Sequence, residues 1–276
     1  MPNGCTKPAR GAKITKPPDV QPEFCCRGTL VYKTNILFCP AFSAARSYGK
    51  GDTAAASWLL KGKHMKITDG QILLFTGDSI TDCGRGYPVG KNDRLGDGYV
   101  ALVDNLLRAG YPQHKITVLN TGISGNRVID LQARWQQDVL QLKPHWLSML
   151  IGINDVWRHF DSPDEPVQVD SERFEQGYRT LLEQTRPKVA GLVLMSPYYI
   201  EPRLDDPMRR QMDIYGEIVR LLAAQFDAVF VDLQAAFDAY LRYRPAQSLC
   251  DDRIHPNRTG HMIIARAFLT AVQFEW

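Results

Sequence analysis

The sequence ILLFTGDSITD, residues 72 to 82, decides the fold that we predict for this chain. An unbroken apolar run that stops at a glycine is typical of a buried parallel strand that ends in a tight turn. Ser79 then stands at the carboxyl end of that strand, where open α/β sheets bind their ligands. A serine on the turn into a helix presents its hydroxyl and its backbone N–H to that crevice. The stretch therefore predicts a functional serine at the sheet edge.

From Met65 onward, apolar runs alternate with amphipathic segments, which is the pattern of βαβ units around a parallel sheet. The expected strands are residues 72–76, 116–120, 146–151, 192–196 and 228–232. The expected helices are residues 99–108, 128–140, 172–185, 208–225 and 258–274. Right-handed crossovers between five such strands predict an α/β fold, a three-layer α/β/α sandwich with a five-stranded parallel sheet of flavodoxin type.

Residues 1–64 differ from the rest of the chain in composition. They hold ten Lys and Arg against three Asp and Glu, whereas the remaining residues hold 23 against 27. The segment is rich in Pro and Gly and shows no sustained period, which is typical of disorder. We interpret it as a disordered or non-native leader with Met65 as the functional start; a basic targeting segment is the alternative. The functional domain is then expected over residues 65–276.

The composition excludes several classes of function. With 276 residues, 44% hydrophobic and 23% charged, the chain is expected to be a soluble globular protein with one main domain. It shows neither a clustered basic face for nucleic acid nor an apolar run long enough for a membrane span. The six cysteines lack Cys-x-x-Cys spacing, and four of them lie in the leader. We therefore expect no metal site, no cofactor and a reducing, cytoplasmic location.

Residues 83–98 follow the serine and carry five glycines, which invites a nucleotide-binding interpretation. The glycine spacing misses the dinucleotide fingerprint, and no Gly-Lys-Ser/Thr occurs, so phosphate binding is disfavoured. We interpret the segment as a mobile polar rim over the crevice.

Ser79 needs a base before it can act as a nucleophile, because a free serine hydroxyl is almost never ionised at neutral pH. His255 is the histidine that has a carboxylate, Asp252, three positions before it. A loop leading into the last helix can present both side chains to one crevice. Asp252 would hold the imidazole tautomer while the other ring nitrogen takes the Ser79 proton. This context favours a catalytic role for His255 over that of a surface or core histidine.

Acyl transfer also requires donors where negative charge develops on the carbonyl oxygen. Three candidates end different strands or their following loops: the Ser79 N–H, the Gly125 N–H and the Asn154 side-chain amide. A side chain at position 125 would crowd an approaching substrate, which gives glycine a physical reason there. A plain turn residue is the alternative for both Gly125 and Asn154.

Four sequence blocks occur in an order that resembles the SGNH (GDSL-like) hydrolase family: Gly77-Asp78-Ser79, Gly125, Gly152-Ile153-Asn154-Asp155 and Asp252-Arg253-Ile254-His255. The resemblance spans about residues 65–276. It implies a three-layer α/β/α esterase whose signature residues are Ser79, Gly125, Asn154 and His255. Finer motifs, such as Ile-Gly-Ile-Asn-Asp-Val-Trp-Arg at 151–158, resemble bacterial intracellular acetylxylan esterases, which are carbohydrate esterases that form homo-oligomers. In such relatives a tryptophan precedes the triad aspartate, whereas this chain has Asp251.

The resemblance implies a cytoplasmic serine esterase that removes acetyl groups from xylan-derived oligosaccharides. Asp78, Tyr87, Trp157, Tyr198 and Tyr199 are the expected substrate-binding residues. The four aromatic side chains can stack on sugar rings, and ordinary packing is their alternative role. The competing functions are an esterase or lysophospholipase for longer acyl chains, an acyltransferase, and a non-catalytic binding protein of the same fold.

Overall fold

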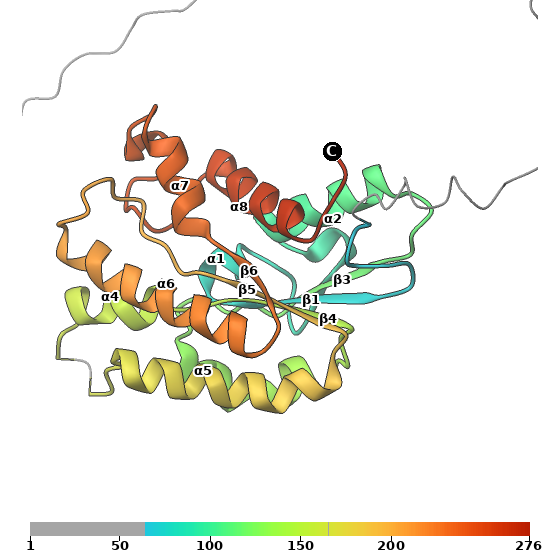
Figure 1. Cartoon of the computed structure of the whole chain (residues 1–276), viewed down its shortest axis with the longest axis horizontal. Helices are drawn as coiled ribbons and strands as arrows, with labels where there is room; N and C mark the ends of the chain where they lie inside the picture. The colour runs from blue at the N-terminus through green and yellow to red at the C-terminus, as the bar shows by residue number, and fades with distance from the viewer. Residues whose placement is uncertain (1–63, 165) are drawn as a thin grey trace, which may run out of the picture. The chain divides into compact units, whose positions relative to one another are not determined.

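The computed structural model describes residues 64–164 and 166–276 (Figure 1). The expected leader lies outside the described residues apart from its last position, so its disorder and the boundary at Met65 stay predictions. Within the described residues, six strands form one sheet in the order β2-β3-β1-β4-β5-β6.

Five of these strands are parallel, as the sequence predicts, and their middle residues are almost all buried. They are β1 (Ile72–Gly77), β3 (Thr117–Asn120), β4 (Trp146–Leu150), β5 (Gly191–Met195) and β6 (Val229–Val231). Taken alone, they follow the flavodoxin strand order, 2-1-3-4-5, which confirms the predicted fold. The sixth strand, β2 (Gly90–Lys91), comes from the glycine-rich rim and pairs antiparallel with β3. The sequence did not predict this edge strand, because two residues carry no periodic signal.

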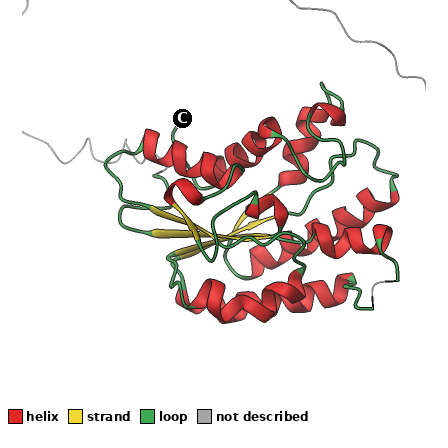
Figure 2. Ribbon diagram, turned by 180° about the vertical axis from the view of Figure 1, so that it is seen from behind, coloured by secondary structure: helices red, strands yellow, loops and turns green. Residues whose placement is uncertain are grey.

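Helices cover both faces of the sheet, and Figure 2 shows the yellow strands between two layers of red helices. One layer holds α2 (Tyr99–Gly110), α7 (Leu233–Leu241) and α8 (Arg258–Ala271), and α8 contacts both of the others. The other layer holds α3 (Val128–Trp135), α4 (Ile153–Asp161), α5 (Ser171–Thr185) and α6 (Pro207–Gln225). The first helix, α1 (Ser79–Asp82), is a single turn at the end of strand β1.

Four of the five expected helices lie within a few residues of their predicted bounds, and the fifth ends differently. Helix α3 stops at Trp135 and continues as a π-turn over Gln136–Leu140. Helices α1, α4 and α7 were not predicted, because they are short and begin directly after strands. Asp232 caps α7 by accepting from Ala235 N–H, a start signal that the sequence does contain.

The strand order places a switch point between β1 and β4. The neighbours of strand β1 are β3 on one side and β4 on the other, and the connections leave in opposite directions from this point. Ligands of open α/β sheets bind outside the carboxyl ends of the strands at such a switch point. Ser79 follows β1 and Asn154 follows β4, so the fold brings these two candidates to the same place.

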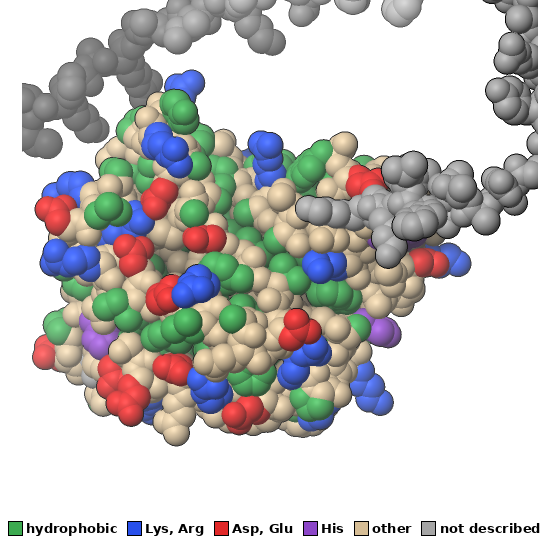
Figure 3. Space-filling view, in the orientation of Figure 1, with side chains coloured by type: hydrophobic (Ala, Val, Ile, Leu, Met, Phe, Trp, Pro, Cys, Tyr) green, Lys and Arg blue, Asp and Glu red, His purple; other side chains and the backbone are tan. Residues whose placement is uncertain are grey.

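Charged side chains of both signs are interspersed on the face drawn in Figure 3. Ion pairs also form along single helices, such as that of Arg220 with Glu217 at 2.5 Å on α6. Among the described residues, none of the helices is both long enough and apolar enough to cross a bilayer.

Candidate active site

Ser79 is the first residue of helix α1, directly after strand β1. The turn requires glycine at position 77, because a Cβ there would lie 2.1 Å from the carbonyl oxygen of Leu150 on β4. Asp78 caps the helix by accepting a 3.0 Å hydrogen bond from the Ile80 N–H. Asp78 is fully buried, whereas Ser79 is half-buried. The local sequence therefore holds the serine at the carboxyl edge of the sheet, at the start of a helix.

The structure brings Ser79, His255 and Asp252 together, although 176 positions separate the serine from the histidine. Ser79 Oγ lies 2.8 Å from His255 Nε2, and His255 Nδ1 lies 2.6 Å from Asp252 Oδ2. Partial burial works against ionisation of Asp252, but hydrogen bonds from the His255 ring and two backbone N–H groups lower its pKa. An ionised aspartate that fixes the imidazole tautomer is what general-base activation of a serine requires.

The loop that carries Asp252 and His255 is fastened to the segment after strand β5. The Tyr198 hydroxyl donates to the carbonyl of Ile254 at 3.3 Å, and the Ile200 N–H donates to the carbonyl of Arg253 at 2.9 Å. The Arg253 guanidinium also donates to the Glu201 carboxylate at 2.7 Å. These contacts hold the two residues between the aspartate and the histidine, so the sheet positions the imidazole.

The other two oxyanion-hole candidates lie at the same edge of the sheet. Asn154 is in the first turn of helix α4 and is 2% exposed. Its Nδ2 donates to the carbonyl of Asn126 at 3.1 Å, which joins α4 to the loop of Gly125. That loop is tied to strand β1, because the Ile123 N–H donates to the carbonyl of Gly77 at 3.0 Å. A side-chain amide carries two N–H groups, so Asn154 retains one for a ligand.

Gly125 is exposed and has a φ of +81°, a conformation that favours glycine. A Cβ at this position would meet no other atom within 4 Å. The need for glycine is therefore conformational within the protein, and the space in front of the backbone is open.

Sequence reasoning missed a carboxylate that holds the Gly125 loop. Asp82 stands one helical turn after Ser79 and is 5% exposed. Its Oδ2 accepts hydrogen bonds from the Ser124 N–H at 3.1 Å, the Ser124 hydroxyl at 2.9 Å and the Tyr87 hydroxyl at 2.8 Å. The helical spacing from Ser79 was the signal that could have placed this side chain near the nucleophile. We name these three residues the Asp82 clamp.

Two arginines complete the support of this loop. Arg85 is 4% exposed and donates to the carbonyl of Gly122 at 2.6 Å. Arg134 donates to the carbonyl of Thr121 and to Asn126 Oδ1, both at 2.7 Å. The backbone on either side of Gly125 is therefore fixed by charge-assisted hydrogen bonds, which are stronger than neutral ones.

Two of the expected substrate-binding residues are corrected by the structure. Asp78 and Tyr198 are both 0% exposed, so neither can touch a ligand. Asp78 is used as a helix cap, and Tyr198 packs its ring 4.4 Å from that of Phe237. Tyr199 is 4% exposed, and its ring lies 5.0 Å beneath the guanidinium of Arg253. Buried hydroxyls and carboxylates that cap or anchor a loop look the same in sequence as those that bind a substrate.

Tyr87 and Trp157 lie where a ligand can reach them. Tyr87 is 51% exposed, and its ring stacks 4.0 Å from the guanidinium of Arg85. Trp157, on helix α4, is partly buried, and its ring centroid is 6.1 Å from that of His255 in an edge-to-face arrangement. Both remain candidates for contact with substrate.

Two buried carboxyls stand directly beside site residues. Burial raises the pKa of Asp78, next to Ser79, and of Asp155, next to Asn154, to about 7 in each case. Asp155 Oδ1 accepts from the Val128 N–H at 2.9 Å, which joins helices α4 and α3. Both carboxyls are fully buried, so they support the neighbouring site residues and are not open to a ligand.

His261, on helix α8, has a packing role. It is 5% exposed, and its Nδ1 accepts from the Tyr99 N–H at 3.2 Å. Burial lowers its pKa to about 4, so it is neutral at physiological pH. Over residues 64–164 and 166–276, no group of three or more His, Cys, Asp or Glu is arranged to hold a metal ion.

A flavodoxin-type sheet that joins a serine, a histidine and an aspartate by hydrogen bonds at its carboxyl edge is the arrangement of a serine hydrolase. Residues 75–263 match the GDSL-like Lipase/Acylhydrolase family, and the chain belongs to this family. The expected resemblance is thereby confirmed, as is the class of enzyme, a carboxylic ester hydrolase.

Several known proteins are similar to this chain. An acetylxylan esterase of Geobacillus stearothermophilus is 51% identical over 217 residues, which cover 77% of this chain and 98% of that protein. The crystal structure of Axe2, an acetylxylan esterase from the same organism, matches with a TM-score of 0.76 over the same shares. An alpha/beta hydrolase enzyme from the metagenome of Lake Arreo, Spain, has a TM-score of 0.75 at 45% identity, covering 76% of this chain and 99% of its own. A thioesterase 1/protease 1/lysophospholipase L1 of Escherichia coli K12 is 32% identical over 55% of this chain and 65% of its own.

Other structures of Axe2 carry single substitutions. Three are described as catalytic mutants, in which alanine replaces a serine, an aspartate, and a histidine three positions after that aspartate. Asp252 and His255 have the same spacing in this chain. Another has isoleucine in place of the tryptophan directly before the aspartate, where this chain has Asp251.

Proposed function

We propose that the protein is a serine esterase that removes acetyl groups from xylan-derived oligosaccharides through an acyl-enzyme. The observation that carries the proposal is the hydrogen-bonded chain from Ser79 Oγ through His255 to Asp252, at 2.8 and 2.6 Å. The acetylxylan esterase that is 51% identical supports the choice of substrate.

In this mechanism Ser79 Oγ attacks the ester carbonyl carbon while His255 Nε2 accepts the hydroxyl proton. Negative charge then develops on the carbonyl oxygen, and the N–H groups of Ser79, Gly125 and Asn154 Nδ2 stabilise it. When the intermediate collapses, the protonated imidazole gives its proton to the departing sugar oxygen. Water, deprotonated by the same nitrogen, hydrolyses the acetyl-serine, and acetate leaves. His255 must be neutral to accept each proton.

The test is replacement of Ser79 by Ala. Turnover of p-nitrophenyl acetate is expected to fall by roughly 10⁴- to 10⁶-fold, as for other nucleophile deletions. Ser171 offers a matched control, because it is also the first residue of a helix, α5, on one outer layer of the sandwich. Ser171→Ala should keep the wild-type rate, and the mechanism fails if Ser79→Ala keeps it too.

Three measurements separate this function from its alternatives. In a series of esters of increasing acyl length, a steep fall in kcat/KM beyond propionyl supports the carbohydrate esterase. A rise toward long chains would favour the lysophospholipase activity that the name of the Escherichia coli relative includes. Labelling of Ser79 by a fluorophosphonate separates an enzyme from a binding protein of the same fold, and xylo-oligosaccharide acceptors test for acyl transfer.

Location and assembly belong to the same proposal. A cytoplasmic homo-oligomer is the state that we expect, and the free thiols of Cys83 and Cys250 are compatible with a reducing compartment. Cell fractionation and light scattering of the purified protein test the two expectations separately.

A further inference from the structure

A pocket of about 270 Å³ lies beside the candidate triad, between helix α4 and the start of helix α6. Trp157 and Phe160 line it from α4, and Pro207 and Met208 line it from α6. Arg253 closes it on the side of the triad loop. We name this space the Trp157 pocket. Its volume is slightly below the usual range of small-molecule sites, about 300 to 1,000 Å³, which suits one small ring better than a long acyl chain.

The Trp157 pocket adjoins the candidate triad through two of its lining residues, Trp157 and Arg253. The indole of Trp157 lies edge-to-face against the His255 ring, with 6.1 Å between centroids. Arg253 is the residue directly after Asp252 in the sequence. A group bound in the pocket therefore lies next to the imidazole that handles the proton of the leaving sugar oxygen.

Arg253 is held in a fixed orientation with its guanidinium partly open to solvent. Its Nη1 donates to Glu201 at 2.7 Å and lies 3.8 Å from Asp206 Oδ2. The ring of Tyr199 supports the guanidinium plane at 5.0 Å. The side chain is nevertheless 41% exposed, and both ion pairs use a single nitrogen. The fork-shaped guanidinium has five N–H donors, so several stay available to a ligand.

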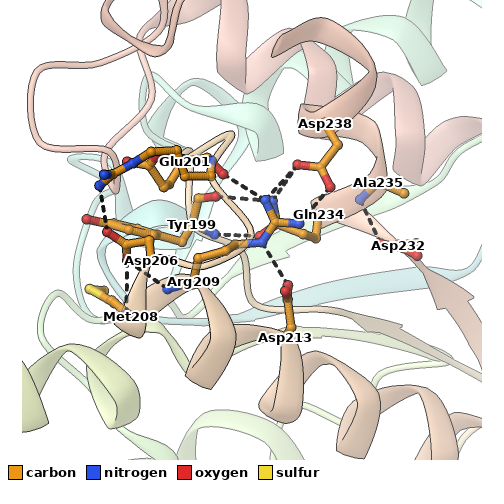
Figure 4. A network of polar contacts seen from close by, with 11 residues as sticks. Tyr199, Glu201, Asp206, Met208, Arg209, Asp213, Asp232, Gln234, Ala235 and Asp238 are labelled. Carbon is orange, nitrogen blue, oxygen red and sulfur yellow. Dashed lines mark hydrogen bonds and ion pairs between the residues drawn. The ribbon is translucent and has the colours of Figure 1, made fainter. Parts of the chain in front are cut away.

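The segment of Tyr199 and Glu201, on which Arg253 rests, is tied to helices α6 and α7 by the polar contacts drawn in Figure 4. Arg209, which is 3% exposed, donates to the backbone carbonyl of Glu201 at 2.7 Å. Its guanidinium also pairs with both oxygens of Asp238, at 2.9 and 2.7 Å. Gln234 exchanges hydrogen bonds with the backbone of Tyr199 at 2.8 and 3.1 Å. The segment beneath Arg253 is thereby fixed before any ligand arrives, which lowers the entropic cost of binding.

The chemistry of the pocket fits a neutral sugar ring. Partly exposed aromatic side chains pack against the C–H face of a pyranose, while guanidinium N–H groups donate to its hydroxyls. Glu201 and Asp206 already neutralise Arg253, so a sugar carboxylate would gain little there. Charged groups at the rim, among them Asp161, make the pocket unsuitable for a hydrocarbon chain.

We propose that the Trp157 pocket binds a neutral sugar ring of the substrate, next to the ring that carries the acetyl ester, with Arg253 as the hydrogen-bond donor and Trp157 and Phe160 as the apolar wall. The proposal rests on the proposed function for the placement of the ester. It assigns Arg253 to substrate specificity and Glu201 to positioning Arg253.

The experiment compares an oligosaccharide with an ester that does not reach the pocket. For each variant we would measure kcat/KM on acetylated xylo-oligosaccharides and on p-nitrophenyl acetate, and take the ratio. Arg253→Met should lower this ratio by about tenfold or more, because hydrogen bonds to a charged donor are lost. Phe160→Ser, which alters the 44% exposed wall residue without touching the triad loop, should lower the ratio severalfold. Arg220→Met, an exposed arginine of α6 paired with Glu217, is the control and should keep the ratio.

Inhibition of p-nitrophenyl acetate hydrolysis by xylobiose gives a second readout, which does not depend on deacetylation. The inhibition constant should rise in Arg253→Met and Phe160→Ser but not in Arg220→Met. Equal loss on both substrates with an unaltered inhibition constant would overturn the subsite and leave Arg253 as a loop anchor, while the proposed function stands. Xylobiose inhibition that weakens in the two pocket variants, without wild-type turnover of acetylated xylo-oligosaccharides, would support the subsite and reject the proposed substrate.

Discussion

The two sides of the crevice are built differently. On the nucleophile side, Asp82 and Asn154 are 5% and 2% exposed, and hydrogen bonds fix the backbone around Gly125. On the imidazole side, the side chains of Asp252 and His255 are each 43% exposed. The difference follows from what each side does in the proposed mechanism. Donors that stabilise a developing charge must be fixed in advance, whereas an imidazole that passes protons to a leaving group and to water needs solvent within reach.

The largest expected effect comes from the open side. Asp252→Asn keeps the shape of the side chain but removes the charge that holds the imidazole tautomer, and kcat on p-nitrophenyl acetate should fall by about 10⁴-fold. The neighbouring Asp251 is exposed and is not part of the hydrogen-bonded chain from Ser79 to Asp252, so Asp251→Asn is a matched control. Steady-state kinetics measure both variants. A loss of kcat of less than tenfold in Asp252→Asn would mean that catalysis does not depend on Asp252 to fix the His255 tautomer.

Substitutions on the nucleophile side should lower activity by displacing the backbone around Gly125. Asp82→Ala removes three hydrogen bonds of the Asp82 clamp at once, which frees the backbone of Ser124 beside Gly125. We expect kcat to fall by about tenfold to 100-fold, the cost of misplacing a catalytic group by roughly an ångström. Tyr87→Phe removes a single bond and should cost less. Asp93→Ala, in the same rim segment and exposed, is the control.

The expected signature of the clamp is a change in kcat with little change in KM, since the Gly125 N–H is proposed to act on the transition state. A change in KM alone would assign the Asp82 clamp to substrate binding and would remove the contrast between the two sides.

The strand order and the convergence of Ser79, Gly125 and Asn154 could be predicted from the sequence, because both follow from the periodic pattern of apolar residues. Five apolar runs separated by amphipathic segments leave few topologies, and each of the blocks of Ser79, Gly125 and Asn154 follows one of those runs directly. Parallel strands end at one edge, so these blocks had to converge there. The spacing of Asp252 and His255, in a loop leading into the last helix, added these two residues to the predicted site, and the resemblance to a known family agreed with it.

The rest of the site depends on tertiary contacts, which the periodic pattern of apolar residues does not reveal. Asp78 and Tyr198 looked like ligand contacts because polar and aromatic residues at strand ends often are, but tertiary packing buries both completely. The helical spacing of Asp82 from Ser79 hinted at its place, but the partners of Asp82 and Arg85 in the Gly125 loop are 37 to 42 positions away in the chain, so their contacts could not be predicted. Arg253 stood between two predicted site residues, yet only the fold showed the pocket that it lines.

The two sides should also differ in how their carboxyl groups affect stability as the pH changes. On the open side, hydrogen bonds lower the pKa of Asp252 below its ordinary value of 3.8. The stability that ionised Asp252 contributes is therefore present above pH 3.8 and is lost as the pH falls below 3.8. On the buried side, the pKa of Asp155 is raised to about 7, and its Oδ2 has no hydrogen-bond partner among the described residues. Such a carboxyl stays protonated in the folded protein over a range where the unfolded chain has ionised it.

The last prediction concerns the free energy of unfolding, whose contribution from Asp155 should change by up to about 1.4 kcal/mol per pH unit. Between pH 4 and 7 the folded state binds more protons at Asp155 than the unfolded state does, so this contribution to the free energy of unfolding falls as the pH rises. Asp155→Asn keeps an acceptor for the Val128 N–H and removes the titration. His261 also titrates near this range but is common to both proteins. The comparison of urea unfolding at pH 4.5, 5.5 and 6.5 therefore reports on Asp155 together with its charge coupling to Asp78. The stability of the wild type relative to Asp155→Asn should decline across the series. A constant difference would mean that Asp155 is ionised in the folded protein. A negative charge would then be buried next to Asn154, where it would oppose the proposed stabilisation of an oxyanion by the Asn154 amide.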